Sequence, residues 1–217
     1  MNRFELIVFD WDGTLMDSAG AIAGALKSAA RDLGLAEPSD ERARHIIGLG
    51  LHDALVSALP DLPEKQYLSL AERYRYHFLA GDSELEMFAG IPELVAGLSR
   101  SGRRLAVATG KTRKGLQRAL ATSGLEALFH SSRCADECRS KPHPQMLYEL
   151  MEELGVMPER TLMIGDTTHD LLLARNAGVE ALAVSYGAHP RAELLAHAPL
   201  ACADSVAELQ RWLDAHA

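Results

Sequence analysis

Apolar residues follow two different spacings along this chain. In residues 18–88 the apolar positions recur at helical spacing, and no strand-like run interrupts this segment. Before and after it, short continuous apolar runs alternate with amphipathic stretches that close at a glycine, such as Gly124 or Gly178. We expect strands near 6–9, 104–109, 129–132, 161–164 and 181–184, and helices near 19–33, 40–47, 51–59, 63–79, 92–101, 112–123, 144–154 and 170–177.

Alternating strands and helices predict a parallel sheet with helices on both faces, because buried parallel strands read as continuous apolar runs. The fold class is therefore α/β, with a Rossmann-like parallel-sheet core and an inserted α-helical cap domain. We predict that residues 1–17 and 89–217 form the catalytic core and residues 18–88 the cap.

Composition excludes several functional classes. The chain has 217 residues, is 47% hydrophobic and 24% charged, and carries a formal net charge of -8, which argues against a nucleic-acid surface. No apolar stretch approaches the length of a membrane span. Met1–Phe4 leads directly into a strand-like run, so we expect no signal peptide and a cytoplasmic location. The three cysteines are too few for a disulfide framework. The sequence does not indicate the oligomeric state.

Candidate chemistry gathers where three predicted strands end. Asp10 and Asp12 follow the first strand, Thr109 and Gly110 end the second, and Asp166 follows a later one. In open parallel sheets the carboxyl ends of the strands form the ligand-binding edge. Asp170 and Lys141, the latter from the preceding loop, are expected at the same edge.

These residue types suit a hard cation and an anionic group. Mg²⁺ binds carboxylate, water and phosphate oxygens, so Asp10 and Asp166 are candidate ligands, and Asp170 can hold a ligand water or orient Lys141. A carboxylate beside the cation can attack phosphorus, and a second carboxyl two residues later can transfer the proton. Thr109 and backbone N–H groups can bind phosphoryl oxygens, while Lys141 adds positive charge.

Four motifs together resemble the haloacid dehalogenase superfamily: Asp10-Trp11-Asp12-Gly13-Thr14-Leu15, Thr109-Gly110-Lys111, Lys141-Pro142 and Gly165-Asp166-Thr167-Thr168-His169-Asp170. The resemblance implies Asp10 as the nucleophile and Asp12 as the general acid and base. It also implies Mg²⁺ on the Asp10 side chain, the Asp12 backbone carbonyl and Asp166. The phosphate-binding residues would be Thr109, Gly110 and Lys141, with Asp170 in support, and the helical insert would be the cap.

Within that superfamily, Ile47–Leu51 and Ser140–Pro144 look most like phosphoglycolate phosphatases, although the second motif reads Thr-Gly-Lys where Thr-Asn-Lys is commoner. We expect a Mg²⁺-dependent phosphatase that hydrolyses a small phosphorylated metabolite through a phospho-aspartyl intermediate.

A sugar-phosphate mutase and a non-catalytic binding protein with the same fold stay open as alternatives. Haloacid dehalogenation ranks low because that chemistry needs neither Asp12 nor the Asp166/Asp170 pair. Phosphonate cleavage also ranks low, since residues 45–60 contain no lysine. The roles of Lys111, His52 and His169 are undecided.

Overall fold

The computed structural model describes residues 3–217, so the first two residues of the Met1–Phe4 segment, and of the predicted core range 1–17, lie outside it. A six-stranded parallel sheet has the order β3-β2-β1-β4-β5-β6, which confirms the predicted α/β class. The strands are β1 (Leu6–Phe9), β2 (Arg104–Thr109), β3 (Ser131–Cys134), β4 (Thr161–Gly165), β5 (Glu180–Val184) and β6 (Cys202–Ala203).

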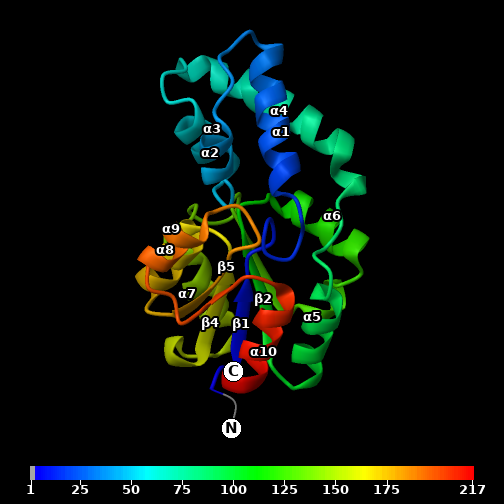
Figure 1. Cartoon of the computed structure of the whole chain (residues 1–217), viewed down its shortest axis with the longest axis vertical. Coiled ribbons are helices and arrows are strands. Elements are labelled where there is room, and N and C mark those ends of the chain that lie inside the picture. Colours follow the sequence, from blue (N-terminus) through cyan, green and yellow to red (C-terminus); the bar gives the residue numbers. More distant parts are fainter. Residues whose placement is uncertain (1–2) are drawn as a thin grey trace.

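The helices lie in two groups (Figure 1). Between β1 and β2 the chain forms α1 (Ala19–Asp32), α2 (Asp40–His45), α3 (Leu51–Ala58) and α4 (Glu64–Gly81), which stand above the sheet in Figure 1. The others flank the sheet: α5 (Ile91–Arg100), α6 (Arg113–Ser123), α7 (Gln145–Leu154), α8 (Thr168–Ala177), α9 (Arg191–Ala196) and α10 (Val206–His216). Short 3-10 helices occupy Asp82–Glu84, Glu126–Leu128 and Pro158–Arg160.

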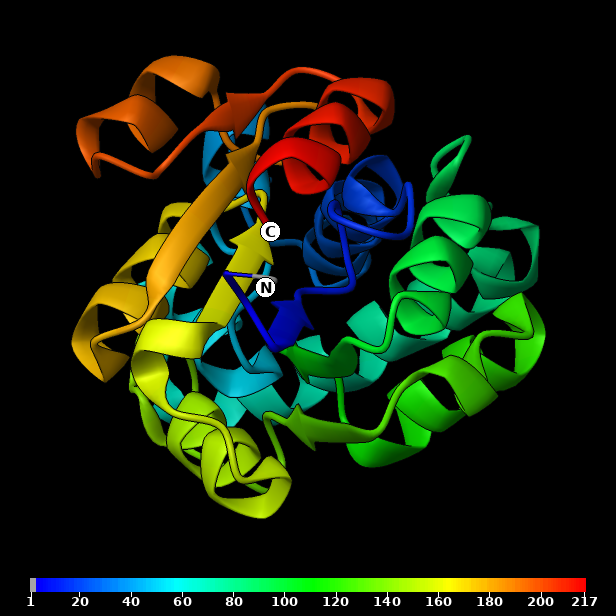
Figure 2. The same ribbon diagram turned by 90° about the horizontal axis from the view of Figure 1, so that it is seen from below.

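Both faces of the sheet are covered (Figure 2). Ile7 and Phe9 point to a core shared with α5, α6 and α10, whereas Leu6 and Val8 point to the core under α7 and α8. This is the alternation expected of a strand, and it explains why β1 consists only of apolar residues that are all buried. In β1, therefore, polar side chains appear only beyond the end of the strand, at Asp10 and Asp12.

Helices α1–α4 have a hydrophobic core of their own, centred on side chains such as Leu26, Leu55 and Leu70. The chain enters and leaves this group through adjacent segments: an isolated antiparallel bridge pairs Met16 with Met87, and the Asp17 N–H donates to the Glu86 carbonyl at 2.9 Å. The block expected to be purely helical therefore contains this one bridge at its end. The domain boundaries themselves stay a prediction.

Most expected elements lie within a few residues of their predicted positions, with two differences. The strand expected at 129–132 is Ser131–Cys134, because pairing with β2 matches Ala106 to Ser131 and Thr109 to Cys134. The sequence pattern predicts no element after residue 184, where the structure has α9, β6 and α10.

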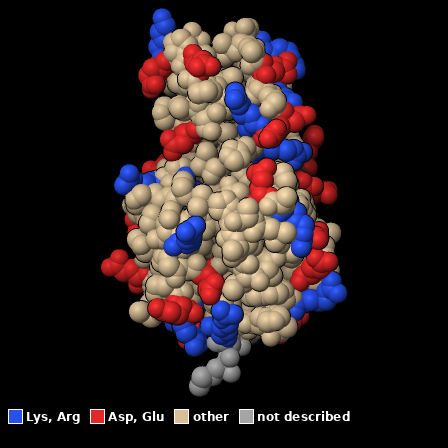
Figure 3. All heavy atoms as spheres, turned by 60° about the vertical axis from the view of Figure 1, so that its left-hand side comes forward, with Lys and Arg blue, Asp and Glu red and all other residues tan. Residues whose placement is uncertain are grey.

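Acidic and basic side chains are interspersed on the face drawn in Figure 3, without a contiguous basic patch there. Among the described residues, none of the helices combines the length and apolar character that crossing a membrane requires.

The separate core of α1–α4 gives a stability prediction. Leu70 on α4 is fully buried, whereas Leu68 on the same helix is 68% exposed. We expect Leu70→Ala to lower the free energy of unfolding by about 2–5 kcal/mol, because a buried leucine leaves a cavity. Leu68→Ala is the matched control and should change it by less than about 0.5 kcal/mol. Urea denaturation followed by circular dichroism measures both, and equal effects would contradict the described packing.

Candidate active site

Strand register brings three of the predicted residues to one edge. Phe9 of β1 lies beside Val107 of β2 and Ile164 of β4, so Asp10, Thr109 and Asp166 follow or end three neighbouring strands. The Asp10 N–H donates to the Ile164 carbonyl at 2.9 Å, which fixes the start of the loop. All three side chains are fully buried.

Lys141 forms the central contacts of this edge. Its Nζ lies 2.8 Å from Asp10 Oδ1 and 2.6 Å from Asp170 Oδ1, and all three side chains have no solvent exposure. Burial alone would lower the pKa of Lys141, but the charges of Asp10 and Asp170 outweigh burial and raise that pKa above its usual value. The two carboxylates thus favour the ammonium form of Lys141 inside the protein.

Asp10, Asp166 and Asp170 form an acidic cluster in which each offers an oxygen within 4.8 Å of the others. Asp10 Oδ2 is buried and accepts no hydrogen bond from any described residue. Burial raises the pKa of Asp10 well above its usual value, and burial together with the charge of Asp170 raises the pKa of Asp166 to about 7. Carboxylate oxygens with an unpartnered buried atom fit a hard divalent cation, which would supply the missing positive charge.

Asp166 is held by groups that the sequence did not reveal as part of the site. The Thr14 hydroxyl donates to Oδ1 at 2.7 Å, and the Ala188 N–H donates to Oδ2 at 2.7 Å. A Cβ at Gly13 would come within 2.1 Å of Asp166 Oδ2, and one at Gly187 within 2.3 Å. The two glycines thus let the backbone close around this carboxylate. Gly13 and Thr14 belong to the first motif, whereas nothing in the sequence marks Ala188.

Asp170 has two partners besides its place in the acidic cluster. Its Oδ1 binds Lys141, while Oδ2 accepts the Thr167 N–H at 3.1 Å and the Thr167 hydroxyl at 2.7 Å. Helix α8 begins at Thr168 with Thr167 as its N-cap, so Asp170 lies in the first turn and is not the cap itself. Asp170 therefore fixes the helix start and orients Lys141 at the same time.

Asp12 lies apart from the acidic cluster and faces the helical insert. Its Oδ1 accepts the Ser18 hydroxyl at 2.7 Å and lies 2.9 Å from Lys111 Nζ. Lys111 Nζ also lies 5.0 Å from the centre of the Phe78 ring on α4. Lys111, whose role the sequence leaves undecided, thus connects Asp12 to α4 of the insert. The Ser18 contact is not predicted from the sequence.

Thr109 and Gly110 lie at the end of β2. Thr109 Oγ1 accepts the Lys111 N–H at 3.2 Å, which leaves the hydroxyl proton free for donation to a ligand. A Cβ at Gly110 would come within 2.3 Å of the Leu49 carbonyl and 2.7 Å of the Gly48 carbonyl. Gly110 therefore permits the 48–49 loop of the insert to pack on the sheet edge, and its predicted contact with phosphate stays a prediction.

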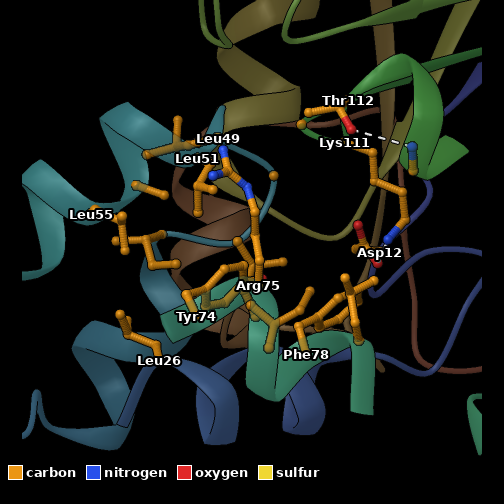
Figure 4. A pocket seen from close by; sticks show the side chains of 18 of the residues that line it. Asp12, Leu26, Leu49, Leu51, Leu55, Tyr74, Arg75, Phe78, Lys111 and Thr112 are labelled. Atoms are coloured by element: carbon orange, nitrogen blue, oxygen red, sulfur yellow. Dashed lines mark hydrogen bonds and ion pairs between the residues drawn. The ribbon is translucent and has the colours of Figure 1, made fainter. Parts of the chain in front are cut away.

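A cavity of about 360 Å³ lies between the helical insert and the sheet edge (Figure 4). Its polar end holds Asp12, Gly110, Lys111 and Thr112. The apolar part of its wall comes largely from α1, α3 and α4 and the loop before α3: Ile22, Leu26, Ile46, Ile47, Leu49, Leu51, Ala54, Leu55, Tyr74, Phe78 and Leu79.

The two undecided histidines lie outside this cavity. His169 Nε2 lies 2.7 Å from the His45 carbonyl, so it links α8 to the insert. His52 stays within the insert, where its ring lies 6.0 Å from that of Tyr67.

This chain matches the model of the haloacid dehalogenase-like hydrolase family over residues 7–184 and belongs to that family. It is 35% identical over 210 residues to "Probable phosphatase IndB" of Dickeya dadantii, covering 94% of this chain and 91% of that protein. It is 32% identical over 216 residues to a "5'-nucleotidase" of Pseudomonas aeruginosa, covering 99% and 97%.

A solved structure of a predicted phosphoglycolate phosphatase from Haemophilus somnus superimposes with a TM-score of 0.84 at 26% identity, covering 97% of this chain and 98% of the other. The predicted superfamily and the prediction of a hydrolase are thus confirmed, and the relatives' names agree with the prediction of a phosphatase.

The raised pKa of Asp166 gives a stability prediction. Its folded-state pKa of about 7 lies above the ordinary value of 3.8, so the metal-free protein loses stability as pH rises from about 4 to 7. Asp166→Asn cannot ionise, so its melting temperature relative to the parent should rise between pH 5 and pH 8. We expect the stability of Asp166→Asn relative to the parent to rise by at least about 1 kcal/mol over this pH range. This corresponds to a relative rise in melting temperature of about 2–4 °C, measured by scanning calorimetry of EDTA-treated protein. A difference that shrinks with pH would contradict a raised pKa of this buried carboxyl group.

The close approach at Gly110 gives an activity prediction. Gly110→Ala should lower phosphatase kcat/KM by about tenfold or more, because the new Cβ pushes the 48–49 loop off the sheet edge. Gly97→Ala on α5 is the control, since a Cβ there meets only Arg100 Nη2 at 3.9 Å. Steady-state kinetics on p-nitrophenyl phosphate compares the two. Parent-like activity of Gly110→Ala would show that this packing is dispensable.

Proposed function

We propose that this chain is a Mg²⁺-dependent phosphomonoesterase in which Asp10 attacks phosphorus and Asp12 transfers the proton. The observation that carries the proposal is Asp10 itself: one carboxylate oxygen faces Lys141 and the other, buried, accepts no hydrogen bond from any described residue. Such an oxygen is suited to bind a metal ion or to attack an electrophile, because no hydrogen bond from a described residue offsets its desolvation.

The metal would be held by Asp10 and Asp166, with the Asp12 carbonyl as a third ligand. When bound, it would neutralise charge on the phosphoryl oxygens and on the two carboxylates. Lys141 stays protonated at its Nζ and supplies a second fixed charge beside the Asp10 oxygen that does not attack. Thr109 can donate its hydroxyl proton to a phosphoryl oxygen, and Asp170 keeps Lys141 in place.

Asp12 suits the proton-transfer role because it borders the cavity that the leaving group would occupy. Its carboxyl would protonate the leaving oxygen as the acyl phosphate on Asp10 forms, and the resulting carboxylate would then remove a proton from the water that hydrolyses this acyl phosphate. Ser18 and Lys111 hold its Oδ1, so Oδ2 is the oxygen left to exchange the proton.

Helices α1–α4 would act as a cap that opens to admit substrate. Asp10 has no solvent exposure, and Gly48 of the insert lies against it: a Cβ there would be 3.7 Å from Asp10 Oδ2. Closure therefore excludes water from the nucleophile. We expect a small phosphorylated metabolite as substrate, phosphoglycolate being the candidate from motif resemblance, and a cytoplasmic location.

Metal removal and loss of the nucleophile test this proposal together. EDTA should abolish turnover of p-nitrophenyl phosphate, and excess Mg²⁺ should restore it. Asp10→Asn should reduce kcat by roughly a thousandfold or more, since no phospho-enzyme can form. Asp61→Asn, an exposed aspartate of the insert, is the control and should keep parent activity. Activity that survives EDTA or Asp10→Asn would refute the mechanism, and inactivity toward a broad panel of phosphate esters would favour a binding protein.

A further inference from the structure

The cavity between the insert and the sheet edge has a wall that is mostly apolar. In Figure 4, Leu26 and Leu55 line one side of the cavity, and Asp12 lies on the other side beside Lys111. Tyr74 and Phe78 of α4 line the wall between them, and Phe78 lies near Lys111. A two-carbon leaving group attached to a phosphate beside Asp12 would leave most of these side chains uncovered. Apolar walls contribute to binding only when apolar ligand surface replaces water against them.

Cations border the same cavity, and they differ in whether they already have partners. Lys111 pairs with Asp12, and Arg118 Nε lies 2.6 Å from Asp82 Oδ2. Arg75 and Lys114, both exposed, form no ion pair with any residue in the range 3–217. Figure 4 shows the Arg75 side chain extending from α4 across the cavity.

We propose that this enzyme selects phosphomonoesters whose alcohol has a ring-sized apolar body and a second anionic group at its far end. The apolar body would cover the cap side chains, and Arg75, assisted by Lys114, would bind the second anion. A guanidinium suits this task because it can bind a carboxylate or phosphate through two hydrogen bonds. This inference rests on the proposed phosphatase function and names its substrate class.

Three esters with similar alcohol leaving groups test it: phosphoglycolate, benzyl phosphate and 4-carboxybenzyl phosphate. We expect kcat/KM to be at least about tenfold higher for 4-carboxybenzyl phosphate than for phosphoglycolate, with benzyl phosphate between them. Arg75→Gln should lower kcat/KM for the carboxybenzyl ester by about threefold to tenfold and leave benzyl phosphate within about twofold. Lys65→Gln, an exposed lysine at the start of α4 outside the cavity, should change neither.

Binding separates this inference from the proposed reaction. The same three esters are titrated calorimetrically into the Asp10→Asn protein with Mg²⁺, and their dissociation constants should follow the same order. If no ester is hydrolysed by the parent protein, the proposed function fails, while the order of affinities still decides the selectivity. Phosphoglycolate ranking first, or equal effects of Arg75→Gln and Lys65→Gln on the carboxybenzyl ester, would overturn the selectivity even in an active phosphatase.

Discussion

The ion pairs of Lys141 with Asp10 and Asp170 are the interaction on which the rest of the site depends. One ammonium pairs with these two carboxylates, and a third carboxylate, Asp166, lies near both of them in a region without solvent. Removing such charges from water costs several kcal/mol per ion unless partners replace the lost hydration. Burial is the main cause that raises the pKa of Asp10 and of Asp166, and the neighbouring carboxylates, whose charge Lys141 compensates only in part, raise both further. A divalent cation is the partner that fits the deficit.

Bringing these like charges together lowers the stability of the protein, and the surrounding backbone holds them in place. Asp10 follows a strand buried on both faces, and Asp166 is bracketed by Gly13 and Gly187, where any Cβ would collide with its carboxylate. Asp170 is fixed in the first turn of α8 by its hydrogen bonds to Thr167. Rigid strand and helix ends therefore hold the like charges together, as expected where stability is exchanged for chemistry.

The sequence predicted the parts of the fold and site that depend on local patterns. Continuous apolar runs identified β1, β2, β4 and β5, and the rule that parallel strands end at one edge brought Asp10, Thr109 and Asp166 together. The two-residue strand β6 is too short to show a pattern, so it was missed with its flanking helices.

Contacts set by tertiary packing were also beyond sequence reasoning. The Ala188 N–H on Asp166 is a backbone contact that any residue could make, and Lys111 was undecided because its partners come from β1's loop and from α4.

The site divides into two halves with different physical character, and this division explains why the reaction is easier to infer than the substrate. The half around Asp10 and Lys141 is buried, so its charges interact strongly, and salt screens them only a little. Few chemistries suit such an arrangement. Arg75 and Lys114 lie exposed at the cavity border, where screening and side-chain freedom make each contact weak. The proposed selectivity therefore combines the apolar wall formed by the insert with these cations. Helices α1–α4 pack around a hydrophobic core of their own, so side chains of the cavity wall such as Leu26 and Leu55 belong to a different core from the strand that positions Asp10.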